Sequence, residues 1–128
     1  IGSVKGVEIG DGFQVAAAYG SENNDPFYIE NEHVTKKTNH AGGILGGISD
    51  GSPILIRAAV KPTPSIFKTQ STISKSGENI DIQIKGRHDP VIVPRAVVVV
   101  ESMAAITLMD ALLANMTSRM DRIIDFYK

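Results

Sequence analysis

The sequence predicts an α+β fold in which an antiparallel sheet packs on one long apolar helix. Residues 80–84 alternate apolar and polar side chains, a pattern typical of a strand with one apolar face. A turn signal at residues 76–79 separates them from a second strand-like run at residues 72–74, as in a β-hairpin. Residues 95–115 are rich in Ala, Met and Leu, which outweighs the strand preference of four consecutive valines and indicates a helix.

The composition narrows the class of protein. A chain of 128 residues fits one domain, 1–128, with a modest core. The net charge of −1 argues against nucleic acid or a membrane surface as the main partner. The absence of cysteine excludes disulfides and thiolate metal sites and is compatible with a cytoplasmic location. Because Glu101, Thr107 and Asp110 interrupt the longest apolar stretch, we expect no membrane span.

The chain begins with a strand and a short helix. Residues 4–9 alternate with a period of two, which predicts the strand. Asp11, between two glycines, suits the N-cap of a helix over residues 13–18. Gly20 suits the end of that helix.

Two loop-like segments follow. Residues 21–38 are polar and indicate an exposed loop or hairpin whose charges lie in solvent, with a weak strand at residues 27–29. Residues 39–51 hold five glycines, which let a main chain approach a ligand closely. This segment is neither G-x-G-x-x-G nor a P-loop, and a tight turn between strands explains it equally well.

The remaining elements are a strand and two helices. The apolar run in residues 53–61 predicts the strand. Pro94 suits the first turn of the long helix. Polar residues gather on no single face of that helix, so we expect further residues or a second subunit to cover most of its sides. A last helix is expected over residues 117–127, with Ser118 and Asp121 placed for a cap.

Two stiff polar segments are the candidate sites. In residues 61–65, Lys-Pro-Thr-Pro-Ser, the prolines stiffen a tip that presents Lys61 beside hydroxyls, which suits a phosphate. A proline-stiffened loop with a solvated lysine is the alternative. In residues 86–90, Gly-Arg-His-Asp-Pro, Arg87 could clamp an anion and Asp89 could accept a proton. An Arg–Asp pair that stabilises the bend is the alternative there.

Read together in their order, these motifs resemble the chorismate synthase family. The resemblance rests on residues 4–13, Val-Lys-Gly-Val-Glu-Ile-Gly-Asp-Gly-Phe, on residues 39–49, on the two stiff segments, and on the Pro-Arg-Ala-Val start of the long helix. It implies a β-α-β sandwich fold and a homotetramer. It also implies elimination of phosphate from 5-enolpyruvylshikimate 3-phosphate to give chorismate, the last step of the shikimate pathway, with reduced FMN as the required cofactor.

The resemblance also implies roles for single residues. Asp89 would be the acidic group near the proton chemistry, with His88 as a second candidate. Arg87 would face both the flavin and the substrate phosphate. Further contacts to reduced FMN are implied for Ser3, Gly46, Lys61, Pro62, Thr63, Pro64 and Ser65.

Length is where the chain departs from the family. Full members are much longer, and their catalytic histidines and several substrate-binding arginines have no counterpart here. We therefore expect a C-terminal portion that cannot turn over substrate alone. Two other interpretations stay open: a stand-alone flavin- or phosphate-binding module, and an oligomerisation module held together by the apolar helix.

Overall fold

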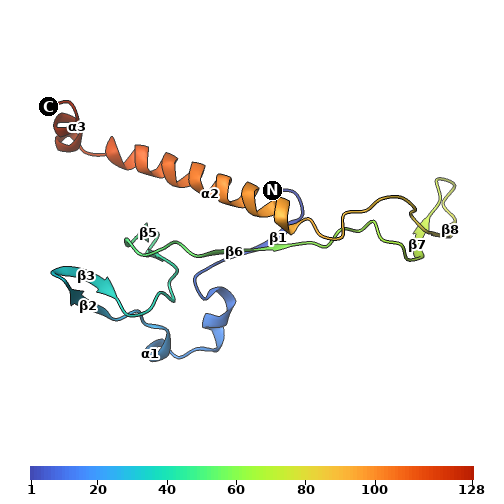
Figure 1. The fold of residues 1–128 in the computed structure, drawn as a ribbon, viewed down its shortest axis with the longest axis horizontal. Coiled ribbons are helices and arrows are strands. Elements are labelled where there is room, and N and C mark those ends of the chain that lie inside the picture. Colours follow the sequence, from blue (N-terminus) through green and yellow to red (C-terminus); the bar gives the residue numbers. More distant parts are fainter. The chain divides into compact units, whose positions relative to one another are not determined.

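Strand pairing is antiparallel throughout the chain and forms four two-stranded ladders, as the computed structural model of residues 1–128 shows (Figure 1). The ladders pair β1 with β6, β2 with β3, β4 with β5 and β7 with β8. The elements in chain order are β1 (Val4–Ile9), η1 (Gly12–Ala17), α1 (Gly20–Asn23), β2 (Phe27–Glu30), β3 (His33–Lys36), β4 (Ile44–Leu45), β5 (Ile48–Ser49), β6 (Ile56–Val60), β7 (Gln70–Ile73), β8 (Asn79–Ile82), α2 (Val93–Met116) and α3 (Met120–Phe126). The α+β class, the antiparallel pairing and the long apolar helix are confirmed.

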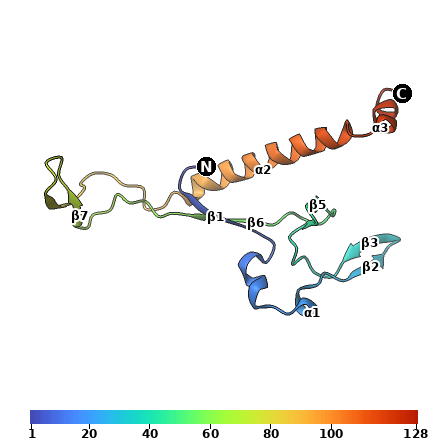
Figure 2. The same cartoon turned by 180° about the vertical axis from the view of Figure 1, so that it is seen from behind.

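The chain divides into two units, Gly2–Lys61 and Pro62–Lys128, the second of which also includes Ile1. The first unit is built on the ladder of β1 and β6, which the reverse view also displays (Figure 2). The predicted strand over residues 53–61 begins only at Ile56. The reason is that Leu55 bonds outside the ladder: its amide donates to Gly42 and its carbonyl accepts from Gly10.

The helix predicted over residues 13–18 is wrong in its details. Gly12–Ala17 is a 3₁₀ helix, and Gly20 begins α1 instead of ending the preceding helix. The Asp11 side chain makes no capping hydrogen bond. It is engaged elsewhere, because its Oδ2 lies 2.7 Å from Nδ1 of His40 and accepts a hydrogen bond from Asn23 at 2.9 Å.

The polar segment, residues 21–38, contains the hairpin that its sequence allowed. Strands β2 and β3 pair in the register Tyr28↔Thr35. Their two-residue turn, Asn31 and Glu32, has positive φ at both positions, 50° and 65°. Such angles match the right-handed twist of the flanking strands, and asparagine tolerates them better than most residues.

In the second unit, β7 and β8 form the expected hairpin with slightly shifted bounds. The register runs from Gln70↔Ile82 to Ile73↔Asn79. The connection is closed by the Ser74 amide, which donates to the Glu78 carbonyl at 2.8 Å. Strand β8 ends at Ile82, two residues before the predicted end at residue 84.

Helix α2 is longer than predicted and none of its residues is buried. Pro94 lies in its first turn, as expected. Hydroxyls inside the helix are satisfied by the preceding turn: Ser102 donates to the Val98 carbonyl and Thr107 to that of Met103. By length and composition α2 could cross a membrane, but core helices of other proteins meet the same criterion. The expected cover on α2 is not supplied within residues 1–128.

The last helix is shorter than its prediction. Helix α3 covers Met120–Phe126 instead of residues 117–127, and no side chain caps its start. Two residues were expected to form this cap, Ser118 and Asp121, and the side chains of both have other partners. Ser118 donates to the Asn115 carbonyl at 2.7 Å, and Asp121 pairs with Arg119 at 2.6 Å.

Candidate functional site

The lysine segment, residues 61–65, is irregular, as its two prolines predict. It follows β6 directly and contains no helix or strand. Its first residue is tied to the start of the chain, because the Lys61 amide donates to the Ser3 carbonyl at 2.7 Å. Ser3 has a positive φ of 66°, which is uncommon for a residue with a side chain. The structure thus brings together two predicted flavin contacts, Ser3 and Lys61.

Thr63 carries an unusual polar atom. Its Oγ1 is shielded from solvent and has no hydrogen-bond partner in the chain. The next residue, Pro64, is fixed by Gln70, whose side-chain amide donates to the Pro64 carbonyl at 3.0 Å. Buried hydroxyls almost always find a partner, so an orphaned one calls for an explanation such as a ligand.

The glycine-rich segment forms a tight hairpin, which we call the glycine hairpin (residues 42–51). Strands β4 and β5 pair as Ile44↔Ser49 and Leu45↔Ile48. The turn between them, Gly46 and Gly47, has φ values of 59° and 79°, the signs of a type I′ turn. The open space around both glycines leaves their backbone free to approach a ligand. The tight turn is confirmed, and the flavin contact of Gly46 stays a prediction.

The base of the glycine hairpin is as crowded as its tip is open. A Cβ atom on Gly42 would press on the amide nitrogen of Gly10 and lie 2.5 Å from its Cα. On the opposite side, the Asp50 amide donates to the Gly43 carbonyl at 3.1 Å. The base therefore has little room to change its conformation.

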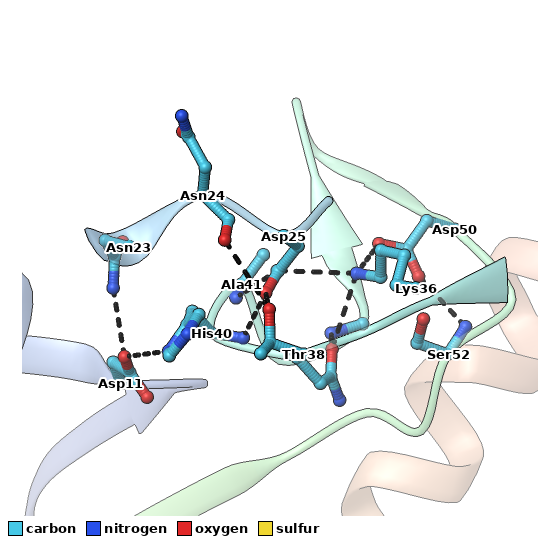
Figure 3. Close-up of polar contacts among 12 residues, drawn as sticks. Asp11, Asn23, Asn24, Asp25, Lys36, Thr38, His40, Ala41, Asp50 and Ser52 are labelled. Carbon is cyan, nitrogen blue, oxygen red and sulfur yellow. Dashed lines mark hydrogen bonds and ion pairs between the residues drawn. The ribbon is translucent and has the colours of Figure 1, made fainter. Parts of the chain in front are cut away.

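An ion-pair cluster lies beside this base, as Figure 3 shows. Lys36 Nζ lies 2.7 Å from Oδ2 of Asp50 and 3.5 Å from Oδ2 of Asp25. The side chains of Lys36 and Asp25 are only 5% and 8% exposed. The prediction that charges of the polar segment lie in solvent is therefore wrong for these two. No motif or periodicity in the sequence signals them, because a lysine in a polar run is ordinarily a surface residue.

Asp25 is held ionised by the backbone that follows the polar segment. Its carboxylate accepts hydrogen bonds from the amides of His40 and Ala41 and from the Thr38 hydroxyl, at 2.7–2.9 Å (Figure 3). Burial opposes ionisation, but the Ala41 amide, the Thr38 hydroxyl, the His40 amide and the Lys36 charge together hold the pKa of Asp25 well below its usual range. Asp25 is therefore a fixed negative charge at neutral pH.

Lys36 and Asp50 reinforce each other's charges. The hydrogen bond to Asp50 is the main cause that raises the pKa of Lys36, and the same bond lowers the pKa of Asp50. Asp50 also accepts the Ser52 amide at 2.9 Å, which closes a short turn after the hairpin. The ammonium is consequently shared by two carboxylates that belong to different parts of the chain.

The second stiff segment, residues 86–90, lies between β8 and α2 and is also irregular. Asp89 pairs with Arg95 of α2 at 2.8 Å, with exposed fractions of 45% and 80%. The alternative of an Arg87–Asp89 turn pair is therefore wrong, because Arg95 takes the carboxylate. His88 packs edge-on against Phe67, with ring centroids 4.9 Å apart, and its Nε2 lies 3.4 Å from the Ile84 carbonyl.

The predicted site residues fall in both units. Ser3, Gly46 and Lys61 belong to the first, and Pro62, Thr63, Pro64, Ser65, Arg87, His88 and Asp89 belong to the second. No cluster of three or more His, Asp or Glu side chains in the chain could hold a metal ion. Besides His88 and Asp89, the predicted site residues offer two cations, Lys61 and Arg87, together with hydroxyls and free backbone, groups that suit a phosphate.

Comparison with known proteins gives a consistent family. A sequence profile described as chorismate synthase matches residues 1–113. The chorismate synthase of Agathobacter rectalis is 68% identical over 128 residues, covering 100% of this chain and 35% of that protein. The chorismate synthase of Methanocaldococcus jannaschii is 60% identical over 115 residues, covering 88% of this chain and 30% of that protein.

A solved structure supports the same family. A crystal structure of chorismate synthase matches with a TM-score of 0.68 and 32% sequence identity, covering 99% of this chain and 31% of that one. The chain therefore spans about a third of the length of the relatives it matches. The chain belongs to the chorismate synthase family, and it matches a C-terminal portion of those proteins.

Proposed function

We propose that this chain contributes one wall of a reduced-FMN pocket in a chorismate synthase. The reaction would remove phosphate and a ring proton from 5-enolpyruvylshikimate 3-phosphate and so give chorismate. The observation that carries the proposal is the orphaned hydroxyl of Thr63 in the centre of the lysine segment. It lies in one of the ordered motifs that are shared with the family, and it needs a partner that the chain does not supply.

The residues present fit a flavin with a phosphate tail. Lys61 would pair with the flavin phosphate, while the hydroxyls of Thr63 and Ser65 would donate to its oxygens. The open turn at Gly46 would let the main chain approach the cofactor without a side chain in between. Bound reduced FMN would supply electron density transiently as the phosphate leaves, although the overall reaction is redox-neutral.

The second stiff segment would serve the substrate. Arg87 forms no ion pair in the chain, so its guanidinium is available to clamp the substrate phosphate in bidentate fashion. Asp89 is half-exposed and would accept a proton near the flavin, with Arg95 fixing its orientation. His88, held edge-on by Phe67, would be the alternative proton carrier.

We further propose that residues 1–128 are inactive alone and act within a homo-oligomer in the cytoplasm. The exposed apolar side chains along α2 support assembly, because a helix with many exposed apolar residues ordinarily packs against a partner. Light scattering tests assembly directly. A monodisperse monomer of the full-length protein would contradict it.

The experiment uses what we call the grafted enzyme, in which residues 1–128 replace the matching segment of the Agathobacter rectalis relative. Chorismate formation is measured anaerobically with reduced FMN. We expect turnover by the grafted enzyme, none by residues 1–128 alone, and a large loss in Lys61→Met. Lys68→Met is the matched control, since it removes the same charge from an exposed site close by. Full activity of Lys61→Met would contradict the role of this segment.

A further inference from the structure

Three charged side chains outside the stiff segments, those of Asp25, Lys36 and Asp50, form ion pairs at the base of the glycine hairpin. We infer that Asp25, Lys36 and Asp50 are positioning residues that fix its base and so present the Gly46 turn to the flavin. The inference rests on the proposed function. It gives a task to the polar segment, residues 21–38, which the family motifs leave without one.

The hairpin cannot fix its own orientation. Strands β4 and β5 have two residues each, and so short an antiparallel pair is not stable alone. A Cβ atom added at Gly46 or at Gly47 would meet no other part of the chain within 4 Å. The direction in which the turn points therefore depends on the contacts at the hairpin base.

Those contacts lead to Lys36 from both sides of the hairpin. On the entering side, Asn39 Oδ1 accepts the Gly43 amide at 2.8 Å, and the same oxygen lies 3.5 Å from Lys36 Nζ. On the leaving side, Asp50 binds Lys36 at 2.7 Å. Asn39 also donates to the Pro53 carbonyl at 2.8 Å, which closes the base after the hairpin. Lys36 is the one side chain that contacts both Asn39 on the entering side and Asp50 on the leaving side, and it adds to the bond between the Asp50 amide and the Gly43 carbonyl.

The charge balance makes the cluster sensitive to loss of the lysine. One ammonium faces two carboxylates, Asp25 and Asp50, and none of the three is more than 12% exposed. Without Lys36, two like charges would remain close together with little solvent to screen them. Their repulsion would push Asp50, on the strand that leaves the hairpin, away from Asp25 and from the amides of residues 40 and 41 that Asp25 binds. The turn would then sample several directions, of which only one suits the flavin.

The test compares Lys36→Met with Lys37→Met in the grafted enzyme. Lys37 is the adjacent residue and is exposed, so its variant changes the charge equally without touching the cluster. If the hairpin base is correctly arranged only about a tenth of the time, the Kd for reduced FMN rises about tenfold. We expect this rise for Lys36→Met and almost none for Lys37→Met. The kcat at saturating reduced FMN should be retained, because bound flavin restores the arrangement.

Hydrogen exchange supplies a second readout that does not depend on catalysis. The amides of residues 42–51 should exchange faster in Lys36→Met, whereas those of β7 and β8 should be unchanged. A role limited to overall stability would instead lower the active fraction and speed exchange throughout the chain. An unchanged Kd together with unchanged exchange of residues 42–51 would overturn the inference.

A second variant covers the case in which Lys36→Met does not fold. Asp50→Asn keeps the side-chain shape and an acceptor for the Ser52 amide, but it loses the charge that binds Lys36. It should raise the Kd for reduced FMN in the same direction, and an unchanged Kd would overturn the inference. If the unmodified grafted enzyme failed to bind reduced FMN, the proposed function would fail instead. Exchange of residues 42–51 would still decide whether the cluster holds the hairpin.

Discussion

The close packing at the base of the glycine hairpin can be tested with alanine substitutions at two glycines, only one of which lies in the packed region. Gly42 and Gly47 both have positive φ, 65° and 79°. An alanine at either position therefore costs about 1–2 kcal/mol for the left-handed backbone. Only at Gly42 would the added Cβ also collide with backbone atoms, those of Gly10 and Ile9. At Gly47 it would meet open space.

The collision sets the expected difference. Backbone atoms cannot turn away as a flexible side chain can, and overpacking of this kind costs about 1–3 kcal/mol. Gly42→Ala should thus lose about 2–5 kcal/mol in local opening free energy and Gly47→Ala about 1–2 kcal/mol. The gap between the two variants corresponds to a factor of about 5–150 in exchange rate.

Native-state hydrogen exchange of the grafted enzyme measures that gap. The informative amides are those of Gly10 and Leu55, which donate across the hairpin base to Leu55 and Gly42 respectively. Both should exchange faster in Gly42→Ala than in Gly47→Ala. Equal rates in the two variants would refute the tight approach of residues 10 and 42.

Three further predictions follow from the charges and from α2. The pKa of Asp25 is lowered in the folded chain, so its stabilising contribution is complete above the unfolded value of about 4 and is lost as the pH falls further. The protection factors of the amides of residues 42–51, which compare measured with intrinsic exchange rates, should therefore fall below about pH 4, and Asp25→Asn should weaken that acid dependence. Arg95→Met breaks an exposed pair and should change thermal stability by less than about 1 kcal/mol while slowing chorismate formation; unchanged turnover would remove Arg95 from the site. Replacing Val98 and Ile106 on α2 with serine should reduce the oligomer size seen by light scattering; an unchanged size would show that these side chains lie outside the interface.

The sequence was informative where local chemistry decides the outcome. Alternation of side chains predicts β1, and glycine content allows the turn at Gly46, because strand period and positive φ are properties of neighbouring residues. The length of α2 follows in the same way from a long run of helix-forming residues that begins with Pro94. The irregular form of both stiff segments follows from their prolines and glycine.

Contacts between distant residues could not be predicted in this way. Asp11 looks like a helix cap until His40, 29 residues later, takes its carboxylate. The sequence around Lys36 is typical of a surface charge, and its partner Asp50 lies 14 residues later in the chain. Arg95 displaces Arg87 as the partner of Asp89 for the same reason, since only the path of the chain into α2 brings it close. Each correction depends on tertiary pairing, which a local pattern does not contain.

Binding of reduced FMN to the grafted enzyme is the most direct measurement of the proposed pocket. It is made by anaerobic titration of the unmodified protein, Thr63→Val and the exposed-site control Thr72→Val. Removing an orphaned hydroxyl should leave the ligand-free protein as stable as before, because valine needs no hydrogen-bond partner. We predict that Thr63→Val alone weakens binding of reduced FMN while keeping its thermal stability. Equal affinity in all three proteins would contradict the assignment of the lysine segment to the flavin pocket.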